Sequence, residues 1–283
     1  MLGSYRGLTE VVAARAAHPR LTGYVLGYAG LDLRMRTPLR RLVVASAAPT
    51  ITIDFDEAIR SVHTPGGAER TAPSPVFGVM DKPVDVELSG THYGIGIRLT
   101  PCGAFSLLDL PMRELVSTQV PLDRTLDRRQ ERRLADQLAS APCWSDRFDL
   151  LDRLLPGLLA AGPAPSEAVL RAWQRLAETS GQILVSSLAD ASGLGRRRLE
   201  ELFREQIGVT PKAAARILRF HKAFRLITDE TRQPALATVA AVCGYSDQAH
   251  LTREVRAFAG RTPRSLRPRD TERAAACEVL TGP

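Results

Sequence analysis

One sequence pattern occurs twice in the C-terminal third of this 283-residue chain, and the duplication constrains the fold more than any other feature. The copies are offset by 51 residues at their first glycine and by 52 residues from Leu199 onward. A repeat near fifty residues with matched apolar positions indicates a duplicated supersecondary unit. The matched positions are Ala189 and Ala240, Gly193 and Gly244, Leu199 and Leu251, Phe203 and Val255, and the Gly-x-Thr-Pro closures at 208–211 and 260–263.

Each copy predicts a helix-turn-helix, that is, a short helix, a tight turn and a longer second helix. Gly193 and Gly244 follow the short helices, where a left-handed residue reverses the chain at little cost. Ala189 and Ala240 are small enough to let the two helices of each unit cross closely. The longer helices are expected at 196–206 and 247–259, with a connecting helix at 211–228.

Capping residues predict where these helices begin. Ser246 is expected to cap the second helix of the second unit, with Asp247 at its positive end, whereas Gly195 offers the first unit a weaker cap. Thr210 and Thr262 each precede a proline, a residue that fits the first position of a helix. New helices are therefore expected from 211 and from 263.

The exposed faces of the two longer helices carry groups suited to reading DNA. Arginine pairs with guanine and glutamine with adenine in the major groove, and a recognition helix uses residues near its N-terminal end for this. A connecting helix of about 27 Å, at 1.5 Å per residue, could hold both helices in successive major grooves about 34 Å apart. The residues on these faces are Arg196, Arg197, Arg198, Glu200, Glu201 and Arg204 in the first helix, and Asp247, Gln248, His250, Arg253 and Arg256 in the second.

Charge is distributed unevenly along the chain. Residues 166–270 hold 18 Lys and Arg against 11 Asp and Glu, whereas the rest of the chain holds 20 of each. Such a basic segment favours a polyanionic partner, because arginines that neutralise phosphates release counterions. A solvated surface in an arginine-rich protein, in which only three of 38 cations are lysine, is the alternative explanation.

Residues 166–267 resemble the DNA-binding domain of the AraC/XylS family of bacterial transcription regulators. The resemblance is carried by Gly-Tyr-Ser-Asp-Gln-Ala-His-Leu at 244–251, by the Gly-x-Thr-Pro closure at 260–263, and by the tandem arrangement itself. It implies that Arg197, Glu201, Gln248, Ala249 and Arg253 face the bases. The chain departs from the family pattern at Gly195, where serine is common, and at Leu251, Val255 and Ala259, where aromatic residues are common.

Structural roles compete with DNA contact at several of these positions. Arg198, Arg216 and Arg225 are equally suited to ion pairs with Glu201, Glu200 or Asp229 on exposed helices. We interpret His250 as a packing or rim residue rather than a base reader. The residues assigned to the core are Trp173, Leu199, Leu202, Phe203, Tyr245 and Leu251.

The N-terminal part has a β-rich pattern, so the predicted class is α+β, with a barrel or sandwich-like N-terminal domain before an all-α DNA-binding domain. Strands are expected at 39–45, 50–55, 76–80, 84–88 and 93–99, and helical spacing begins after Pro101. We expect a regulatory, effector-binding or dimerisation domain over 1–125, a helical connector over 126–165 and a tandem helix-turn-helix domain over 166–270. The Pro-rich segment 162–166 is the expected linker.

The partners expected from this architecture are duplex DNA, a second copy of the chain and a small-molecule effector, with RNA polymerase as a further candidate. The sequence leaves open which effector, operator and direction of regulation apply. No membrane span, cofactor or metal is expected, since apolar runs are short and the histidines and cysteines show no metal-ligand spacing. Scattered cysteines and early charges at Arg6, Glu10 and Arg15 favour a reducing cytoplasm.

An enzymatic N-terminal domain fused to the DNA-binding module is the alternative hypothesis. A DNA-repair methyltransferase of that kind needs a Pro-Cys-His-Arg nucleophile motif, whereas this chain has Pro101-Cys102-Gly103 with no histidine after it. Cys102 therefore lacks the neighbouring base that would activate it. We predict that the protein is not an enzyme.

Overall fold

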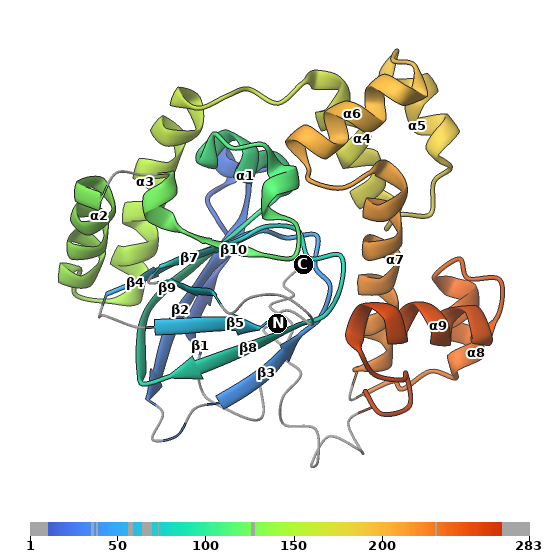
Figure 1. Ribbon diagram of the computed structural model, residues 1–283, viewed down its shortest axis with the longest axis horizontal. Helices are drawn as coiled ribbons and strands as arrows, with labels where there is room; N and C mark the ends of the chain where they lie inside the picture. Colours follow the sequence, from blue (N-terminus) through green and yellow to red (C-terminus); the bar gives the residue numbers. More distant parts are fainter. Residues whose placement is uncertain are drawn as a thin grey trace.

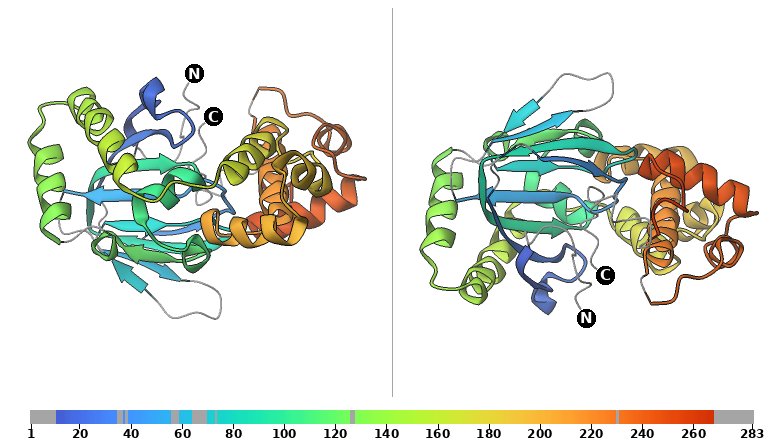
Figure 2. Two further views of the ribbon diagram at one scale, coloured as in Figure 1. Left: turned by 90° about the horizontal axis from the view of Figure 1, so that it is seen from above. Right: turned by 90° about the horizontal axis from the view of Figure 1, so that it is seen from below.

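The computed structural model describes residues 11–34, 37, 39–55, 59–63, 70–72, 74–125, 128–229 and 231–267. A β-rich half is followed by a helical half that lies at one end of it (Figures 1 and 2). The predicted α+β class, with two helix-turn-helix units in the helical half, is confirmed. The first ten residues, Cys277 and the end of the predicted 166–270 domain lie outside the described residues.

Two antiparallel sheets build the β-rich half. The first has six strands in the order β1-β2-β9-β4-β7-β10, and the second has four in the order β3-β8-β5-β6. The strands are β1 (Val11–Arg15), β2 (Val25–Arg34), β3 (Leu39–Val43), β4 (Thr50–Asp54), β5 (Ile59–His63), β6 (Arg70–Ala72), β7 (Pro75–Phe77), β8 (Val84–Ser89), β9 (Thr91–Leu99) and β10 (Gln119–Pro121).

The two faces of the six-stranded sheet differ in chemistry. Ile51 pairs with Ile97 and Ile53 with Ile95, and this apolar face packs on the helices that follow the sheet. The opposite face carries Phe77, which joins a small buried cluster with Val84 and Val86 of β8 in the second sheet. Alternation along the strands therefore places the first face outward under helices and the second face between the sheets.

Helices α1 (Pro101–Leu108), α2 (Arg128–Ser140) and α3 (Trp144–Ala161) accompany the sheets, with short 3-10 helices at Pro19–Leu21 (η1), Met112–Leu115 (η2) and Leu122–Arg124 (η3). Thr100 caps α1, since its hydroxyl accepts a hydrogen bond from the Gly103 amide at 3.0 Å. Phe148, Leu151 and Leu155 of α3 are buried against the outer face of the sheet. These contacts fix α3 on the sheet.

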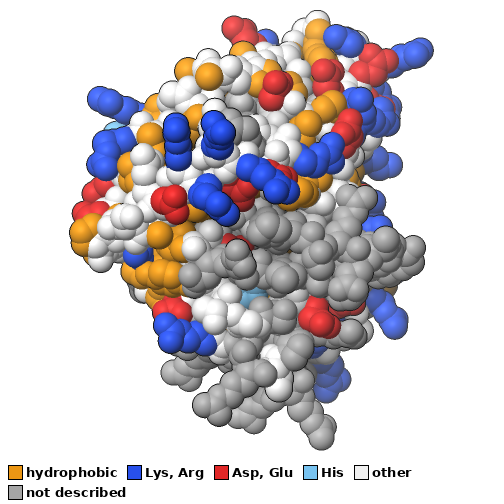
Figure 3. Space-filling view, turned by 60° about the vertical axis from the view of Figure 1, so that its left-hand side comes forward, with side chains coloured by type: hydrophobic (Ala, Val, Ile, Leu, Met, Phe, Trp, Pro, Cys, Tyr) orange, Lys and Arg blue, Asp and Glu red, His pale blue; other side chains and the backbone are white. Residues whose placement is uncertain are grey.

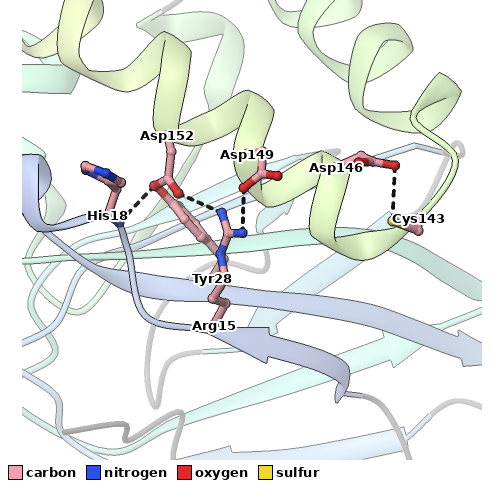
Figure 4. Close-up of polar contacts among 7 residues, drawn as sticks. All are labelled: Arg15, His18, Tyr28, Cys143, Asp146, Asp149 and Asp152. Carbon is pink, nitrogen blue, oxygen red and sulfur yellow. Dashed lines mark hydrogen bonds and ion pairs between the residues drawn. The ribbon is translucent and has the colours of Figure 1, made fainter.

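A polar network reinforces this docking of α3 (Figure 4). The Arg15 guanidinium contacts Asp149 and Asp152, each at 2.6 Å, and the Tyr28 hydroxyl donates to Asp152 at 2.7 Å. Burial and the hydrogen bond to Asp152 raise the pKa of Tyr28, so the hydroxyl remains a donor. Two strands are thereby joined to a helix more than 120 residues away.

Several boundaries differ from the sequence prediction. The helical spacing expected after Pro101 corresponds to α1, which begins at Pro101 itself, and then only to the short η2. The helix expected from Pro263 is a set of turns. Five strands were missed: β1, β2, β5, β6 and β10.

The helical half contains α4 (Glu167–Glu178), α5 (Val185–Ser192), α6 (Arg196–Gln206), α7 (Pro211–Ile227), α8 (Leu236–Val242) and α9 (Gln248–Ala259). Helices α5 and α6 form the first helix-turn-helix, α8 and α9 form the second, and α7 connects them (Figure 1). All six residues predicted for the core are buried, among them Trp173 and Tyr245.

The two halves share one hydrophobic cluster. Val44 and Ala45, in the segment between β3 and β4, and Cys102 of α1 are buried with the core residues of α4 to α9. The Ala45 amide donates to the Phe258 carbonyl of α9 at 2.8 Å, and its carbonyl lies 2.7 Å from Nε2 of His221 on α7. We call this contact region the domain seam.

His221 is neutral in the seam. Its pKa is lowered to about 4, chiefly by burial; the Ala45 carbonyl opposes this shift, and the charges of Arg98 and Arg225 contribute to it. Because a carbonyl only accepts hydrogen bonds, Nε2 must carry the proton and donate it to Ala45. The seam therefore depends on a neutral imidazole in one tautomer.

Candidate nucleic-acid interface

The turns of the two helix-turn-helix units have the same geometry. Gly193 and Gly244 follow the short helices with φ of 71° and 73°, in the left-handed region that favours glycine. Ala189 and Ala240 are 7% and 2% exposed, so their methyl groups lie where the helices of each unit meet. Both predicted turns are confirmed, and they place α6 and α9 in matching positions of the two units.

The N-terminal ends of α6 and α9 differ in capping. Asp247 caps α9, since its carboxylate accepts a hydrogen bond from the His250 amide at 2.6 Å. The expectation that Ser246 fills this position was wrong, because the Asp247 carboxylate takes the helix amide and the Ser246 hydroxyl bonds to Asp247 and His250 instead. Gly195 begins α6 without a side-chain cap, as predicted.

Helix α7 holds the two units in a fixed relation. The Thr210 hydroxyl accepts from the Ala213 amide at 3.2 Å, so α7 is capped as predicted. Arg216 makes a two-pronged ion pair with Glu254 of α9 at 3.0 and 2.8 Å, and its guanidinium lies over the Phe258 ring. Arg216 therefore pairs with Glu254 and not with Glu200, Glu201 or Asp229, the partners considered from the sequence.

Helix α6, the longer helix of the first unit, carries a row of ion pairs. Arg196 and Arg204 contact Glu200 at 3.2 and 3.8 Å. Arg197 and Arg198 contact Glu201 at 3.2 and 3.4 Å, so the expected pair of Arg198 with Glu201 is present. All four arginine side chains are at least half exposed, and that of Arg197 is 95% exposed.

Helix α9, the longer helix of the second unit, presents a different face. Gln248, Ala249, Arg253 and Arg256 are exposed. His250 is half-buried, packs edge-on against Tyr245 with ring centroids 5.2 Å apart, and lies 3.1 Å from the Ser246 hydroxyl. This is the packing role predicted for His250.

The exposed starts of α6 and α9 lie away from the seam. Phe258, near the end of α9, bonds to Ala45, and the segment after α6 contacts η2, where Gly208 lies against Met112. The seam thus uses the C-terminal ends of both recognition helices. Their N-terminal ends, with Arg196, Arg197 and Gln248, are left exposed.

The face of the molecule in Figure 3, which turns the left-hand side of Figure 1 forward, shows blue cationic and red acidic side chains interspersed. One group of buried polar residues lies between the two sheets. The register pairs Thr50 with Arg98 and with Phe77, and Phe77 with Gln119, so these side chains share the face turned toward the second sheet.

The thiols and membrane propensity bear on other functions. Cys102 is fully buried and burial raises its pKa to about 12, so its thiolate is strongly disfavoured. Cys243 is also buried, whereas Cys143 is exposed and hydrogen-bonds to Asp146 (Figure 4).

Within the described part of the chain, no group of His, Cys, Asp and Glu is arranged to hold a metal ion, and none of the helices is long and apolar enough to cross a bilayer.

Comparison with known proteins identifies the helical half. Residues 188–269 match the family described as "Helix-turn-helix domain". The HTH-type transcriptional activator RhaS of Pectobacterium carotovorum is 31% identical over 88 residues. The C-terminal domain belongs to the AraC type of helix-turn-helix domain. This agrees with the helix-turn-helix units predicted from the repeat and with the family resemblance of residues 166–267.

The AraC-type domain accounts for only part of the chain and of its relative. The match covers 31% of this chain and 31% of RhaS, so the chain is similar to about a third of that protein. Residues 14–121 match a second family, described as a domain of unknown function (DUF6597).

Two solved structures resemble the fold at low identity. The C-terminal domain of AraT, a response regulator from Geobacillus stearothermophilus, is 18% identical with a TM-score of 0.34, covering 37% of this chain and 86% of that one. Apo ToxT from Vibrio cholerae is 10% identical with a TM-score of 0.48, covering 89% of this chain and 98% of that one.

Proposed function

We propose that the protein is a sequence-specific DNA-binding transcription regulator that acts in the bacterial cytoplasm. The observation that carries this proposal is the pair of exposed helices α6 and α9, joined by the capped α7 and held by the ion pair of Arg216 with Glu254. Helix α7 has 17 residues, about 26 Å at 1.5 Å per residue, which is compatible with recognition helices in successive major grooves.

The base-reading residues in this proposal lie at the starts of the two helices. Arg197 offers a guanidinium suited to guanine, and Gln248 offers an amide suited to adenine. Both side chains are exposed, so neither has to leave the core to reach a base. The remaining residues of the proposed interface are Arg196, Arg198, Glu201 and Arg204 of α6, and Ala249, Arg253 and Arg256 of α9, with His250 at its rim.

A salt titration of the full chain tests DNA binding. Because arginines that contact phosphates release counterions, the affinity for duplex DNA should fall by orders of magnitude between about 50 and 200 mM salt. Fluorescence anisotropy with a labelled duplex selected from a random pool measures this dependence. An affinity that stays flat across the titration rules the proposal out.

We also propose that the β-rich half regulates DNA binding by binding a small-molecule effector or a second copy of the chain. The support for an effector is the set of buried polar residues between the sheets, in which Thr50 and Gln119 are 8% and 2% exposed. Thr52 and Asp54, at 3% and 6%, follow Thr50 along the same face. Buried polar groups of this kind fix the orientation of ligands that have hydrogen-bonding groups.

Ligand-dependent melting tests the effector proposal. A panel of small polar metabolites should include one that raises the melting temperature of the full chain, by mass action on the folded state. Gln119→Leu should abolish that rise while leaving the melting curve without ligand cooperative. If the rise persists in Gln119→Leu, the ligand binds elsewhere.

A further inference from the structure

The ion pairs on α6 form two sets, each centred on one glutamate. Glu200 contacts Arg196 on one side and Arg204 on the other, whereas Glu201 contacts Arg197 and Arg198. Every arginine that α6 offers to DNA is therefore already beside a carboxylate. Glu200 is the more enclosed of the two glutamates, with 28% of its side chain exposed against 46% for Glu201.

Helix α9 lacks this arrangement. Its one glutamate, Glu254, faces α7 and pairs with Arg216. No carboxylate of the described residues lies within ion-pair distance of Arg253 or Arg256. The two units thus have similar backbones and different electrostatics, since the four arginines of α6 are in ion pairs, whereas Arg253 interacts with the Asp247 charge only at longer range.

We propose that Glu200 and Glu201 are specificity-determining residues of the first helix-turn-helix unit. They hold the four arginines in ion pairs along α6, so that a base or phosphate competes with a carboxylate for each guanidinium. The inference rests on the proposed DNA-binding function. In that function, α9 supplies most of the sequence-independent attraction to DNA. Helix α6 adds affinity chiefly where contacts with bases compensate for weakened ion pairs.

The physical reason is competition for the same guanidinium groups. Each pair engages one guanidinium nitrogen, so a phosphate that binds the other nitrogens must approach the negative charge of the glutamate, and contacts of α6 with random DNA are weakened. A base edge that accepts two hydrogen bonds repays the exchange, because a bidentate arginine contact adds discrimination against other bases. One exposed ion pair between residues four apart on a helix changes an equilibrium constant by about twofold. The loss of both ion pairs of one glutamate should therefore change the DNA affinity measurably.

The test compares Glu200→Gln and Glu201→Gln with Glu205→Gln in the full chain. Glu205 is exposed on the same helix, and no ion pair joins it to a described residue. All three changes remove one negative charge from α6, and glutamine has a similar helix propensity. Glu205→Gln therefore controls for net charge alone, and circular dichroism checks that each variant keeps its helices.

Anisotropy titrations use a random-sequence duplex and the duplex selected by the wild-type chain. Glu200→Gln and Glu201→Gln should each bind the random duplex about three- to fivefold more tightly than Glu205→Gln does, from two freed arginines. The slope of log K against log salt should steepen by about one per added phosphate contact. The selected duplex should gain less than twofold, so the ratio of specific to random affinity falls.

Equal behaviour of the three variants on both duplexes overturns the inference, because the charge alone would then explain every change. A separate readout uses heparin, a polyanion without base sequence. Glu200→Gln and Glu201→Gln should elute from heparin at higher salt than Glu205→Gln. If the wild-type chain binds no duplex, the proposed function fails, and the order of elution still decides whether the pairs restrain the arginines.

Discussion

Arg197 and Gln248 stand at the exposed starts of α6 and α9, where a side chain reaches furthest into a groove. Arg197→Ala or Gln248→Ala should cost roughly 1 to 3 kcal/mol on the selected duplex and relax base preference at a few positions. Anisotropy on the selected duplex and on single-base variants of it measures both effects. On random DNA, the affinity of each variant should differ far less from that of the wild-type chain.

Arg171→Ala is the matched control for these substitutions. Arg171 lies on α4, is 55% exposed and pairs with Glu167 at 3.0 Å, so it is an exposed helical arginine outside the proposed interface. Its loss should leave the binding of both duplexes nearly unchanged. Equal losses on selected and random DNA for Arg197→Ala would assign Arg197 to phosphate contact instead of base reading.

His221 makes the stability of the fold depend on pH. Its pKa is about 4 in the folded chain and 6.5 when exposed, so the unfolded chain takes up a proton first as the pH falls. The free energy of unfolding is therefore unaffected by His221 above pH 6.5 and declines between pH 6.5 and 4. From pH 7 to pH 5 the decline due to this group should be about 2 kcal/mol.

Chemical denaturation at pH 7 and pH 5 measures this decline. His221→Gln is the comparison variant, since its side-chain amide can still donate to the Ala45 carbonyl and does not titrate. The variant should lose less stability over this interval than the wild-type chain. If the two chains lose the same amount, the proton uptake belongs to other groups.

At the scale of elements, the crossing of α8 and α9 tests whether the second unit depends on a small residue. Ala240 is 2% exposed, so Ala240→Leu should force the helices apart and cost about 1 to 3 kcal/mol through overpacking. Thermal melting measures the cost, and anisotropy should show weaker DNA binding although Ala240 is buried. Ala241→Leu changes the exposed neighbour on the same helix and should leave both properties nearly intact.

The helices of the C-terminal half were largely predictable because their ends carry local signals. Thr210 with Pro211, and the glycines at 193 and 244, specify where helices start and stop through contacts within a few residues. The error at Ser246 and Asp247 shows the limit of such signals, since two adjacent capping residues compete and only the backbone geometry selects one.

The strands were less predictable because their residues are set by distant contacts. In β2, Gly30 interrupts the apolar alternation, and a side chain there would overlap the Trp144 ring of α3, 114 residues later. The ion pairs of Arg15 with Asp149 and Asp152 likewise join residues that are far apart in the sequence. The residue pattern within one strand cannot reveal such distant contacts. Most residues of the candidate interface, in contrast, lie within the internal repeat.

At the scale of the molecule, the seam places the β-rich half on the side of the helical half away from the proposed DNA contacts. Helices α7 and α9 both bond to Ala45, and the segment around it connects two strands of different sheets. Because Val44 and Ala45 belong to the same cluster as the helical core, the two halves are expected to unfold together. The sequence suggested a flexible linker at 162–166 and could not indicate this contact.

Removing residues 1–160 tests both the seam and the proposed dimer. The fragment exposes the surfaces of α7 and α9 that cover Ala45, so it should melt at a lower temperature than the full chain. If the β-rich half dimerises, it also raises the effective concentration of the second DNA-binding domain. The fragment should then lose much more affinity for a duplex with two half-sites than for a duplex with one.

Sedimentation of the full chain, with and without DNA, separates these two effects. Loss of the seam alone weakens binding to both duplexes by the same factor, because each domain then binds less well by itself. Loss of a dimer interface adds a penalty only on paired half-sites, whose spacing is set by the helical repeat of about 34 Å. A full-length chain that sediments as a monomer in both conditions, together with equal losses on the two duplexes, would eliminate the dimer and leave effector binding as the role proposed for the β-rich half.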